Sequence, residues 1–187
     1  MTAEAFLKMV REGCKDFRGI HLSDAFLAGI DLHLANFSHA QLSNVDLLGA
    51  NLTCVDFREA RLNRVNLRGA HLFRANFVKA TCSQVDFSCA NLHGALLHGV
   101  NLTGVEMPAA QLAHADLRGA NLARANLQGA NLTCANLEHA DLFGANLKET
   151  ILTGVDLRRA SLRRAGKNDP LRFESQEGSE KSSAQAG

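Results

Sequence analysis

Tryptophan and tyrosine are absent from this chain of 187 residues, and all ten aromatic side chains are phenylalanine. The stacking platforms of single-strand nucleic-acid binders and the usual anchors of protein interfaces are therefore largely missing. An excess of charge is also missing, because 20 Lys and Arg oppose 19 Asp and Glu, a formal net charge of +1. This balance argues against a dedicated nucleic-acid binder and equally against an acidic mimic of nucleic acid.

Long apolar runs are missing as well. No stretch approaches the ~20 residues of a membrane-spanning helix, and the N-terminus lacks the charged, apolar and small-residue segments of a signal peptide. The five cysteines are an odd number and include no CxxC pair, which fits unpaired thiols in a reducing compartment. We therefore expect a soluble cytoplasmic protein with no membrane partner.

A five-residue repeat fills most of the chain. From Lys15 to Ala165, every residue whose number ends in 2 or 7 is Leu, Phe, Met or Cys, and every residue whose number ends in 0 or 5 is Ala, Val, Ile or Thr, apart from Lys15. The residue between them is Asn or Asp in 19 of 30 pentads, a type that favours turns because its side chain bonds local backbone. The two positions that follow vary freely, as expected of residues that face solvent.

A period of five matches neither a helix nor a flat strand, and it excludes a heptad coiled coil. The backbone must instead turn in every pentad, so that each Leu or Phe points to a common interior. The pentads resemble the A(D/N)LXX motif of the pentapeptide-repeat family, most clearly from Ala115 to Glu149, and in-register copies cover about four-fifths of the chain.

The resemblance implies an all-β fold, a right-handed quadrilateral parallel β-helix with four pentads in each coil. One feature of the sequence supports four sides independently, because Phe17, Phe37, Phe57 and Phe77 recur at intervals of twenty residues. A four-sided coil stacks these rings on one wall.

Three segments follow from the repeat. Residues 1–14 are predicted to form an N-terminal capping helix, since residues 3–12 are amphipathic and Gly13 is a fitting stop; a membrane-binding or partner-binding helix is the alternative. Residues 15–165 are predicted to form the β-solenoid. The polar residues 166–187 are expected to be mostly disordered.

The predicted core is a tightly packed column of large side chains. Phe77 and Phe87 are expected to face each other within one coil, with Cys82 on the wall between them, where a small residue compensates for two large rings. A reactive role for Cys82 is disfavoured because buried thiols are usually inert. The structural core residues are thus Phe17, Phe37, Phe57, Phe77, Cys82 and Phe87.

Charge is unevenly distributed among the four walls. The charge-rich wall, centred on Phe17, Phe37 and Phe57, carries 13 charged residues. The charge-poor wall carries only Asp31 and Arg74 and is centred on Leu32, Leu52, Leu72, Leu92, Leu112, Leu132 and Leu152. Its outward positions include Leu34, Cys54, Phe73, His93, His114 and Cys134. Few charges and scattered apolar side chains are typical of an interface core, although a neutral wall without a partner is the alternative.

No motif for catalysis or phosphate binding is found, so we expect no enzyme activity and no cofactor. His93, His98 and His114 are near enough in the repeat to consider a metal, but a solvated surface is the simpler interpretation. Two groups of arginines could hold a phosphate or an acidic partner, although nearby carboxylates favour a solvated surface for both. They are Arg58, Arg61, Arg64, Arg68 and Arg74 around one coil, and Arg158, Arg159, Arg163 and Arg164 near the end.

The sequence therefore favours a non-catalytic protein-binding scaffold whose partner is another protein or a second copy of the chain in a homodimer. One branch of the family protects DNA gyrase by imitating duplex DNA, and gyrase inhibition or protection is the alternative function. That mechanism needs strongly acidic walls, whereas residues 15–164 hold 15 basic and 13 acidic residues.

Overall fold

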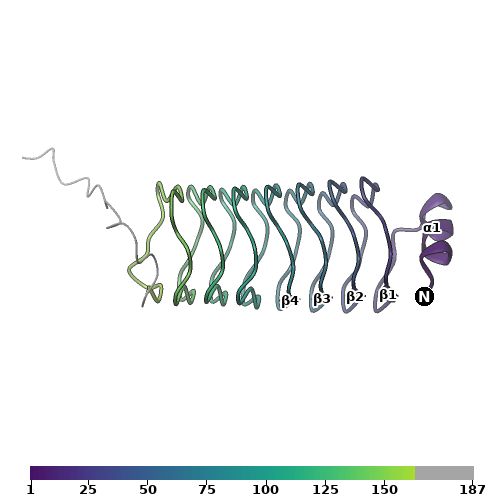
Figure 1. The fold of residues 1–187 in the computed structure, drawn as a ribbon, viewed down its shortest axis with the longest axis horizontal. Coiled ribbons are helices and arrows are strands. Elements are labelled where there is room, and N and C mark those ends of the chain that lie inside the picture. Colours follow the sequence, from purple (N-terminus) through teal and green to yellow (C-terminus); the bar gives the residue numbers. More distant parts are fainter. Residues whose placement is uncertain (163–187) are drawn as a thin grey trace, which may run out of the picture.

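Square coils stack along one axis in the computed structural model, which describes residues 1–162 (Figure 1). Parallel pairing joins residues twenty apart, from Asp16 with Asn36 near one end to Asp141 with Ser161 near the other. Four pentads therefore complete each coil, and the chain is a right-handed quadrilateral parallel β-helix. The predicted polar tail, residues 166–187, lies outside the described residues.

Backbone hydrogen bonds join each coil to its neighbours and close each pentad. Around His71, the N–H of Leu52 donates to the carbonyl of His71 (2.8 Å), and the N–H of His71 donates to the carbonyl of Ala50 (2.9 Å). The following turn is closed by the N–H of Ala75, which donates to the carbonyl of Leu72 (3.0 Å). Because the bonds between coils exist only when coils stack, the stability of each coil depends on its neighbours.

The second outward residue of each pentad has a left-handed backbone. From Gly19 to Gly154, every residue whose number ends in 4 or 9 has a positive φ, between 52° and 71°. Both outward positions were expected to vary freely, but the second one is restricted, because a positive φ favours glycine over residues with a Cβ. At Gly154 the space is also limited, since an added Cβ would lie 2.9 Å from Sγ of Cys134.

Regular strands occur on one wall and in the first four coils only, among the described residues. We call this side the strand wall; it is centred on Leu22, Leu42, Leu62 and Cys82 and continues through Leu102, Leu122 and Leu142. In later coils this side turns instead, as where the N–H of Val105 donates to the carbonyl of Leu102 (3.3 Å). The strands form one parallel sheet in chain order and are β1 (His21–Ser23), β2 (Gln41–Ser43), β3 (Arg61–Asn63) and β4 (Thr81–Ser83).

The interior is a continuous column of buried side chains. The rings of Phe17, Phe37, Phe57 and Phe77 follow one another with centroids 5.0, 5.3 and 5.1 Å apart. Phe87 meets Phe77 edge-on within the same coil at 5.7 Å, and Cys82 is buried on the wall between them. Burial raises the pKa of the Cys82 thiol to about 12, so this sulfur is a packing group and not a nucleophile.

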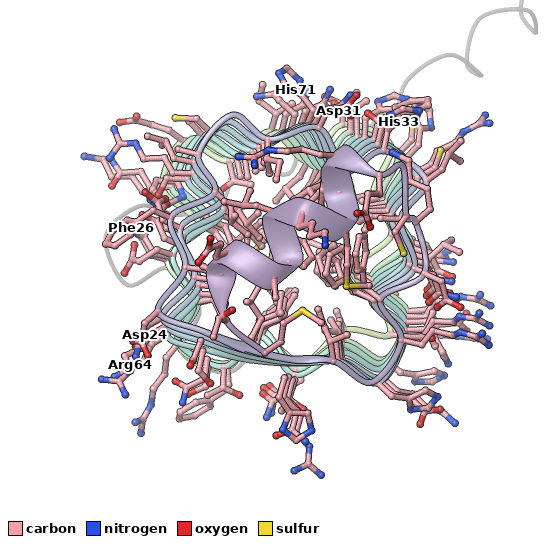
Figure 2. The ribbon with its side chains drawn as sticks, turned by 90° about the vertical axis from the view of Figure 1, so that its right-hand side faces the viewer. Asp24, Phe26, Asp31, His33, Arg64 and His71 are labelled. Carbon is pink, nitrogen blue, oxygen red and sulfur yellow. The ribbon has the colours of Figure 1, made fainter. Side chains whose placement is uncertain are left out.

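The helix α1 (Ala3–Arg11) covers the N-terminal end of the column. Its N-cap is Thr2, whose hydroxyl oxygen accepts a hydrogen bond from the N–H of Ala5 (3.2 Å). Phe6 is fully buried, with its ring 4.8 Å from that of Phe17. Figure 2 shows the helix lying across the square end of the solenoid. No helix within residues 1–162 has the length and apolar character needed to cross a membrane.

Candidate protein-binding wall

The charge-poor wall forms the upper side of the square in Figure 2, where Asp31, His33 and His71 are labelled. Both of its charged side chains have partners on the same wall. Asp31 accepts a hydrogen bond from the backbone N–H of His33 and lies 2.9 Å from Nδ1 of that ring, a contact that lowers the pKa of Asp31. The guanidinium of Arg74 lies 5.2 Å from the centroid of the Phe73 ring. The wall therefore presents little unpartnered charge.

A row of stacked rings lies at the middle of this wall. Phe73 and His93, one coil apart, are nearly parallel, with centroids 5.7 Å apart and an interplanar angle of 11°. His114, in the next coil, meets His93 edge-on at 5.2 Å. Phe73 and His93 are half-buried and His114 is exposed. The three rings form a continuous row in which each ring packs against the next.

Apolar side chains extend the patch toward both ends of the rod. Leu34 is 65% exposed near the N-terminal end, and Ile151 is 48% exposed near the other. Cys54 is half-buried and Cys134 is exposed. Ile151 was not among the predicted wall residues, although the sequence contains a signal for it: an isoleucine stands where most pentads have Asn or Asp. All six predicted wall residues lie on this one side, and Ile151 joins them.

The charge-rich wall differs because its charges form pairs within single pentads. In four pentads an Asp on this wall is followed two residues later by an Arg. In each, the guanidinium lies 2.6–2.7 Å from the carboxylate, and the pKa of the Asp is lowered while that of the Arg is raised. The pairs are Asp16 with Arg18, Asp56 with Arg58, Asp116 with Arg118, and Asp156 with Arg158. The sequence signal is D-x-R inside one pentad, and it leaves this wall locally neutral.

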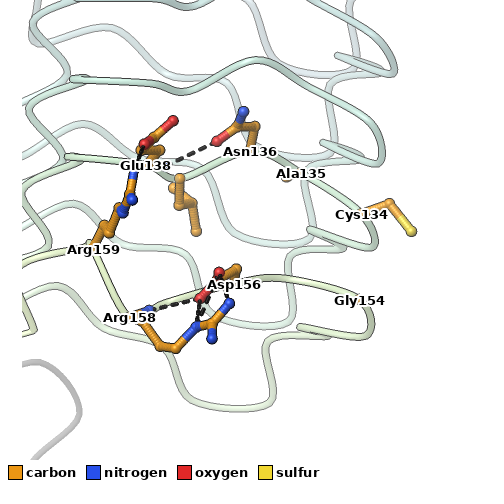
Figure 3. A pocket seen from close by; sticks show the side chains of 9 residues that line it. Cys134, Ala135, Asn136, Glu138, Gly154, Asp156, Arg158 and Arg159 are labelled. Carbon is orange, nitrogen blue, oxygen red and sulfur yellow. Dashed lines mark hydrogen bonds and ion pairs between the residues drawn. The ribbon is translucent and has the colours of Figure 1, made fainter.

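A pocket of about 630 Å³ opens near the end of the described residues, between the pentads 135–139 and 155–159 (Figure 3). Pairing between coils is shifted here: the N–H of His139 donates to the carbonyl of Arg159, twenty residues on, whereas the N–H of His39 donates to that of Arg58, nineteen residues on. The pocket's cations are both partnered, because Arg159 pairs with Glu138 just as Arg158 pairs with its own aspartate.

Within the described residues, the three candidate histidines do not all come together, and two arginines of the first group are already occupied. His98 lies on the charge-rich wall, away from His93 and His114, and residues 1–162 contain no group of three His, Cys, Asp or Glu that could hold a metal. Of the arginines around one coil, Arg58 is paired with its aspartate and Arg74 covers a ring. Arg163 and Arg164 of the second group lie outside the described residues.

The repeat matches a known family model. A model of pentapeptide repeats matches in eight copies, over residues 16–53, 30–69, 50–81, 66–104, 110–148 and 140–165. The chain belongs to the pentapeptide-repeat family. No curated protein matches this pentapeptide-repeat sequence.

Solved structures similar to this pentapeptide-repeat chain come from several sources. HetL, involved in heterocyst differentiation regulation in the cyanobacterium Nostoc, is 26% identical; the match covers 89% of this chain and 98% of HetL, with a TM-score of 0.33. A thylakoid-lumen pentapeptide repeat protein of Arabidopsis thaliana is 36% identical over 52% of this chain and 65% of its own, with a TM-score of 0.39. QnrB1, a plasmid-mediated fluoroquinolone resistance protein, is 16% identical over 81% of both chains, with a TM-score of 0.47.

Proposed function

We propose that this pentapeptide-repeat chain is a non-catalytic scaffold that binds a protein through the charge-poor wall. The observation that carries the proposal is the row of packed rings of Phe73, His93 and His114, flanked by the exposed side chains of Leu34 and Ile151. The cores of protein interfaces are depleted in charge and enriched in aromatic residues. No other wall of the described residues combines a ring stack with so few charges.

The rigidity of the wall favours binding. Away from the ends of the rod, each outward side chain stands on a backbone that is bonded to the coils on both sides, and the central rings are already packed against one another. A surface that is ordered before binding loses little conformational entropy when the partner docks. Seven coils at ~4.8 Å give a platform on the order of 30 Å long, enough for an extended or helical element of a partner to lie along it.

The use of polar side chains along the rod supports a binding role over a catalytic one. The Asn and Asp of the repeat accept hydrogen bonds from backbone N–H groups two residues on, as Asn131 does from Thr133 (3.0 Å) and Asn146 from Lys148 (3.1 Å). These side chains are committed to holding turns. Groups committed in this way are poor candidates for general acids or bases.

Imitation of DNA toward gyrase is less well supported by the surface. Duplex DNA carries about one negative charge per ~1.7 Å of its axis. On the charge-rich wall of this chain, the aspartate of each of the four D-x-R patterns is paired with the arginine two residues on, as in Asp56 with Arg58 at 2.7 Å. Such a wall offers alternating charge instead of a continuous acidic face.

The test is affinity capture from native lysate and sedimentation of the purified chain, with Phe73→Glu as the disruptive variant. Phe143→Glu is the matched control, because Phe143 occupies the same repeat position on the strand wall and is also half-buried. We expect Phe73→Glu to weaken partner capture or self-association by roughly 30-fold or more, as at an interface hot spot. Equal partner capture and self-association in the two variants would contradict the proposed role of this wall. Inhibition of gyrase supercoiling by the wild type would favour the alternative function, imitation of DNA toward gyrase.

A further inference from the structure

Ser161 is preceded by two arginines, in the run Leu157-Arg158-Arg159-Ala160-Ser161-Leu162. It stands where most pentads have Asn or Asp. No other serine or threonine in the chain has a basic residue at both the second and the third position before it. Ser161 is therefore the one hydroxyl-bearing residue of the sequence that follows such a pair of arginines.

The hydroxyl and both guanidinium groups are accessible. Ser161, Arg158 and Arg159 are exposed, and the residue that follows, Leu162, is half-buried. Within residues 1–162, the two guanidinium groups pair with carboxylates at the surface, Arg158 with Asp156 and Arg159 with Glu138. Exposed ion pairs contribute little to stability, so another carboxylate can replace these partners at small cost.

The coil that carries Ser161 is loosely joined to the coil before it. On the charge-rich wall of earlier coils, the Asn or Asp of one coil forms a parallel β-bridge with its equivalent twenty residues on, as Asp116 does with Asn136. Asn136 and Asp156 form no such bridge. The shifted bond at Arg159 and the pocket lie in the same place. Ser161 itself is held by two backbone bonds, from its N–H to the carbonyl of Ala140 (2.9 Å) and from the N–H of Leu142 to its carbonyl (2.8 Å).

An enzyme that modifies a backbone-bonded residue must first draw the segment out as an extended strand. A coil in the middle of the rod resists this, because it is bonded to coils on both sides. Thr81 illustrates the contrast: it occupies the equivalent repeat position in β4 but pairs with Arg61 on one side and Asn101 on the other. The last described coil has fewer backbone bonds to the coil before it, so the free energy needed to detach residues 157–162 is lower.

We propose that Ser161 is a phosphorylation site for a serine/threonine protein kinase that recognises two arginines on the N-terminal side of its acceptor. Carboxylates in the substrate groove of such a kinase would form bidentate pairs with Arg158 and Arg159. The γ-phosphoryl group of ATP is transferred to Oγ of Ser161. The bond from the γ-phosphorus to the bridging oxygen breaks, ADP leaves, and the hydroxyl proton passes to the catalytic base of the kinase.

The test uses the folded full chain, Mg·ATP and the catalytic subunit of the cyclic-AMP-dependent protein kinase, an arginine-directed enzyme, with the phosphorylated residue located by mass spectrometry. We expect a single phosphate on Ser161, none on Thr81, no incorporation in Ser161→Ala, and retained incorporation in Ser161→Thr. The double variant Arg158→Gln with Arg159→Gln should lower kcat/KM for phosphorylation on the order of 100-fold or more, from the loss of two charge-assisted pairs.

Three outcomes would overturn the proposal. They are incorporation that Ser161→Ala does not abolish, phosphorylation of the urea-unfolded chain but not of the folded chain, and a rate that does not depend on the two arginines. Circular dichroism of each variant shows whether it is folded. None of these results depends on the charge-poor wall, so this proposal and the proposed function fail separately.

Discussion

Away from the ends of the rod, each inward side chain packs against its equivalents in the coils on either side. Phe57 is fully buried between Phe37 and Phe77, with ring centroids 5.3 and 5.1 Å away. The main chain around it is fixed by bonds to both neighbouring coils. A side chain removed here leaves a space that the backbone cannot close.

We therefore expect Phe57→Ala to lower the free energy of unfolding by about 3–5 kcal/mol, from lost burial and an unfilled cavity. Phe26→Ala is the control, because Phe26 is 87% exposed and should change stability by less than about 0.5 kcal/mol. Urea unfolding followed by circular dichroism measures both. Equal losses in the two variants would contradict the packing described for the phenylalanine column.

The five thiols should differ in reactivity. With the pKa of Cys82 raised to about 12 by burial, its thiolate fraction at pH 8 is on the order of one in ten thousand. The sulfurs of Cys89 and Cys134 belong to exposed residues. Iodoacetamide at pH 8 should label Cys89 and Cys134 in the native chain and Cys82 only after unfolding. Peptide mass spectrometry reads the result, and rapid native labelling of Cys82 would show that the core opens.

At the scale of elements, α1 protects the open end of the phenylalanine column. Phe6→Asp should bury a charge without a partner against Phe17, unseat the helix and expose the first coil. We expect a lower melting temperature and increased aggregation, since an uncovered β edge promotes association. Ala5→Asp adds the same charge on the exposed side of α1 and should leave both unchanged. Light scattering during a thermal melt measures the two variants side by side.

The D-x-R pairs make the rod sensitive to acid. A hydrogen bond from Arg118 lowers the pKa of Asp116, so the folded state favours the carboxylate. The stabilisation is complete above the unfolded pKa, at about 4, and is lost as the pH falls through the lower folded pKa. Asp116→Asn and Arg118→Gln should each reduce the drop in melting temperature between pH 7 and pH 2.5. A drop as large as in the wild type would mean that this pair contributes nothing measurable.

Some elements could be predicted from sequence, and others could not. The interval of twenty between Phe17 and Phe37 supported the four sides that the family resemblance implied, because a four-sided coil places those rings in contact. The change from strand to turn between Cys82 and Leu102 was not predictable, since the same five-residue pattern runs through both. The pairing of Asp56 with Arg58 could have been predicted, because both lie on the outer side of one pentad.

At the scale of the whole molecule, stability should depend on register and not on a fixed number of coils. Deleting Ala115 to Cys134 joins His114 to Ala135, so every later side chain keeps its wall and its inward or outward direction. We expect a folded rod of the same cross-section, shorter by ~4.8 Å. Circular dichroism and small-angle X-ray scattering measure fold and length.

Deleting only Gln128 to Ala130 is the matched control, because it removes fewer residues but moves each later leucine out of the interior. This variant should lose most of its cooperative unfolding transition. A stable three-residue deletion, or an unfolded twenty-residue deletion, would contradict the packing of coils by register.

One part of the candidate wall could be predicted from the sequence, and another part could not. Counting charges by side was sufficient to find the wall, because side-chain direction follows from the repeat. The stack of Phe73 on His93 and the cover that Arg74 gives to Phe73 depend on rotamers, which no periodicity specifies. The shifted hydrogen bond at Arg159 depends on how the last described coil packs on the coil before it, whereas the five-residue pattern continues through this region unchanged.

The residue with a left-handed backbone in every pentad limits the variety of side chains that a wall can present. That residue must tolerate a positive φ, so the backbone restricts which amino acids fit at its position. The residue before it is not restricted in this way. On each side of the rod, the least restricted outward side chains therefore form a single row, one per coil and ~4.8 Å apart. On the charge-poor wall Phe73 and His93 stand in that row. Substitutions in the row would change what this wall presents to a partner, while the other three sides stay as they are.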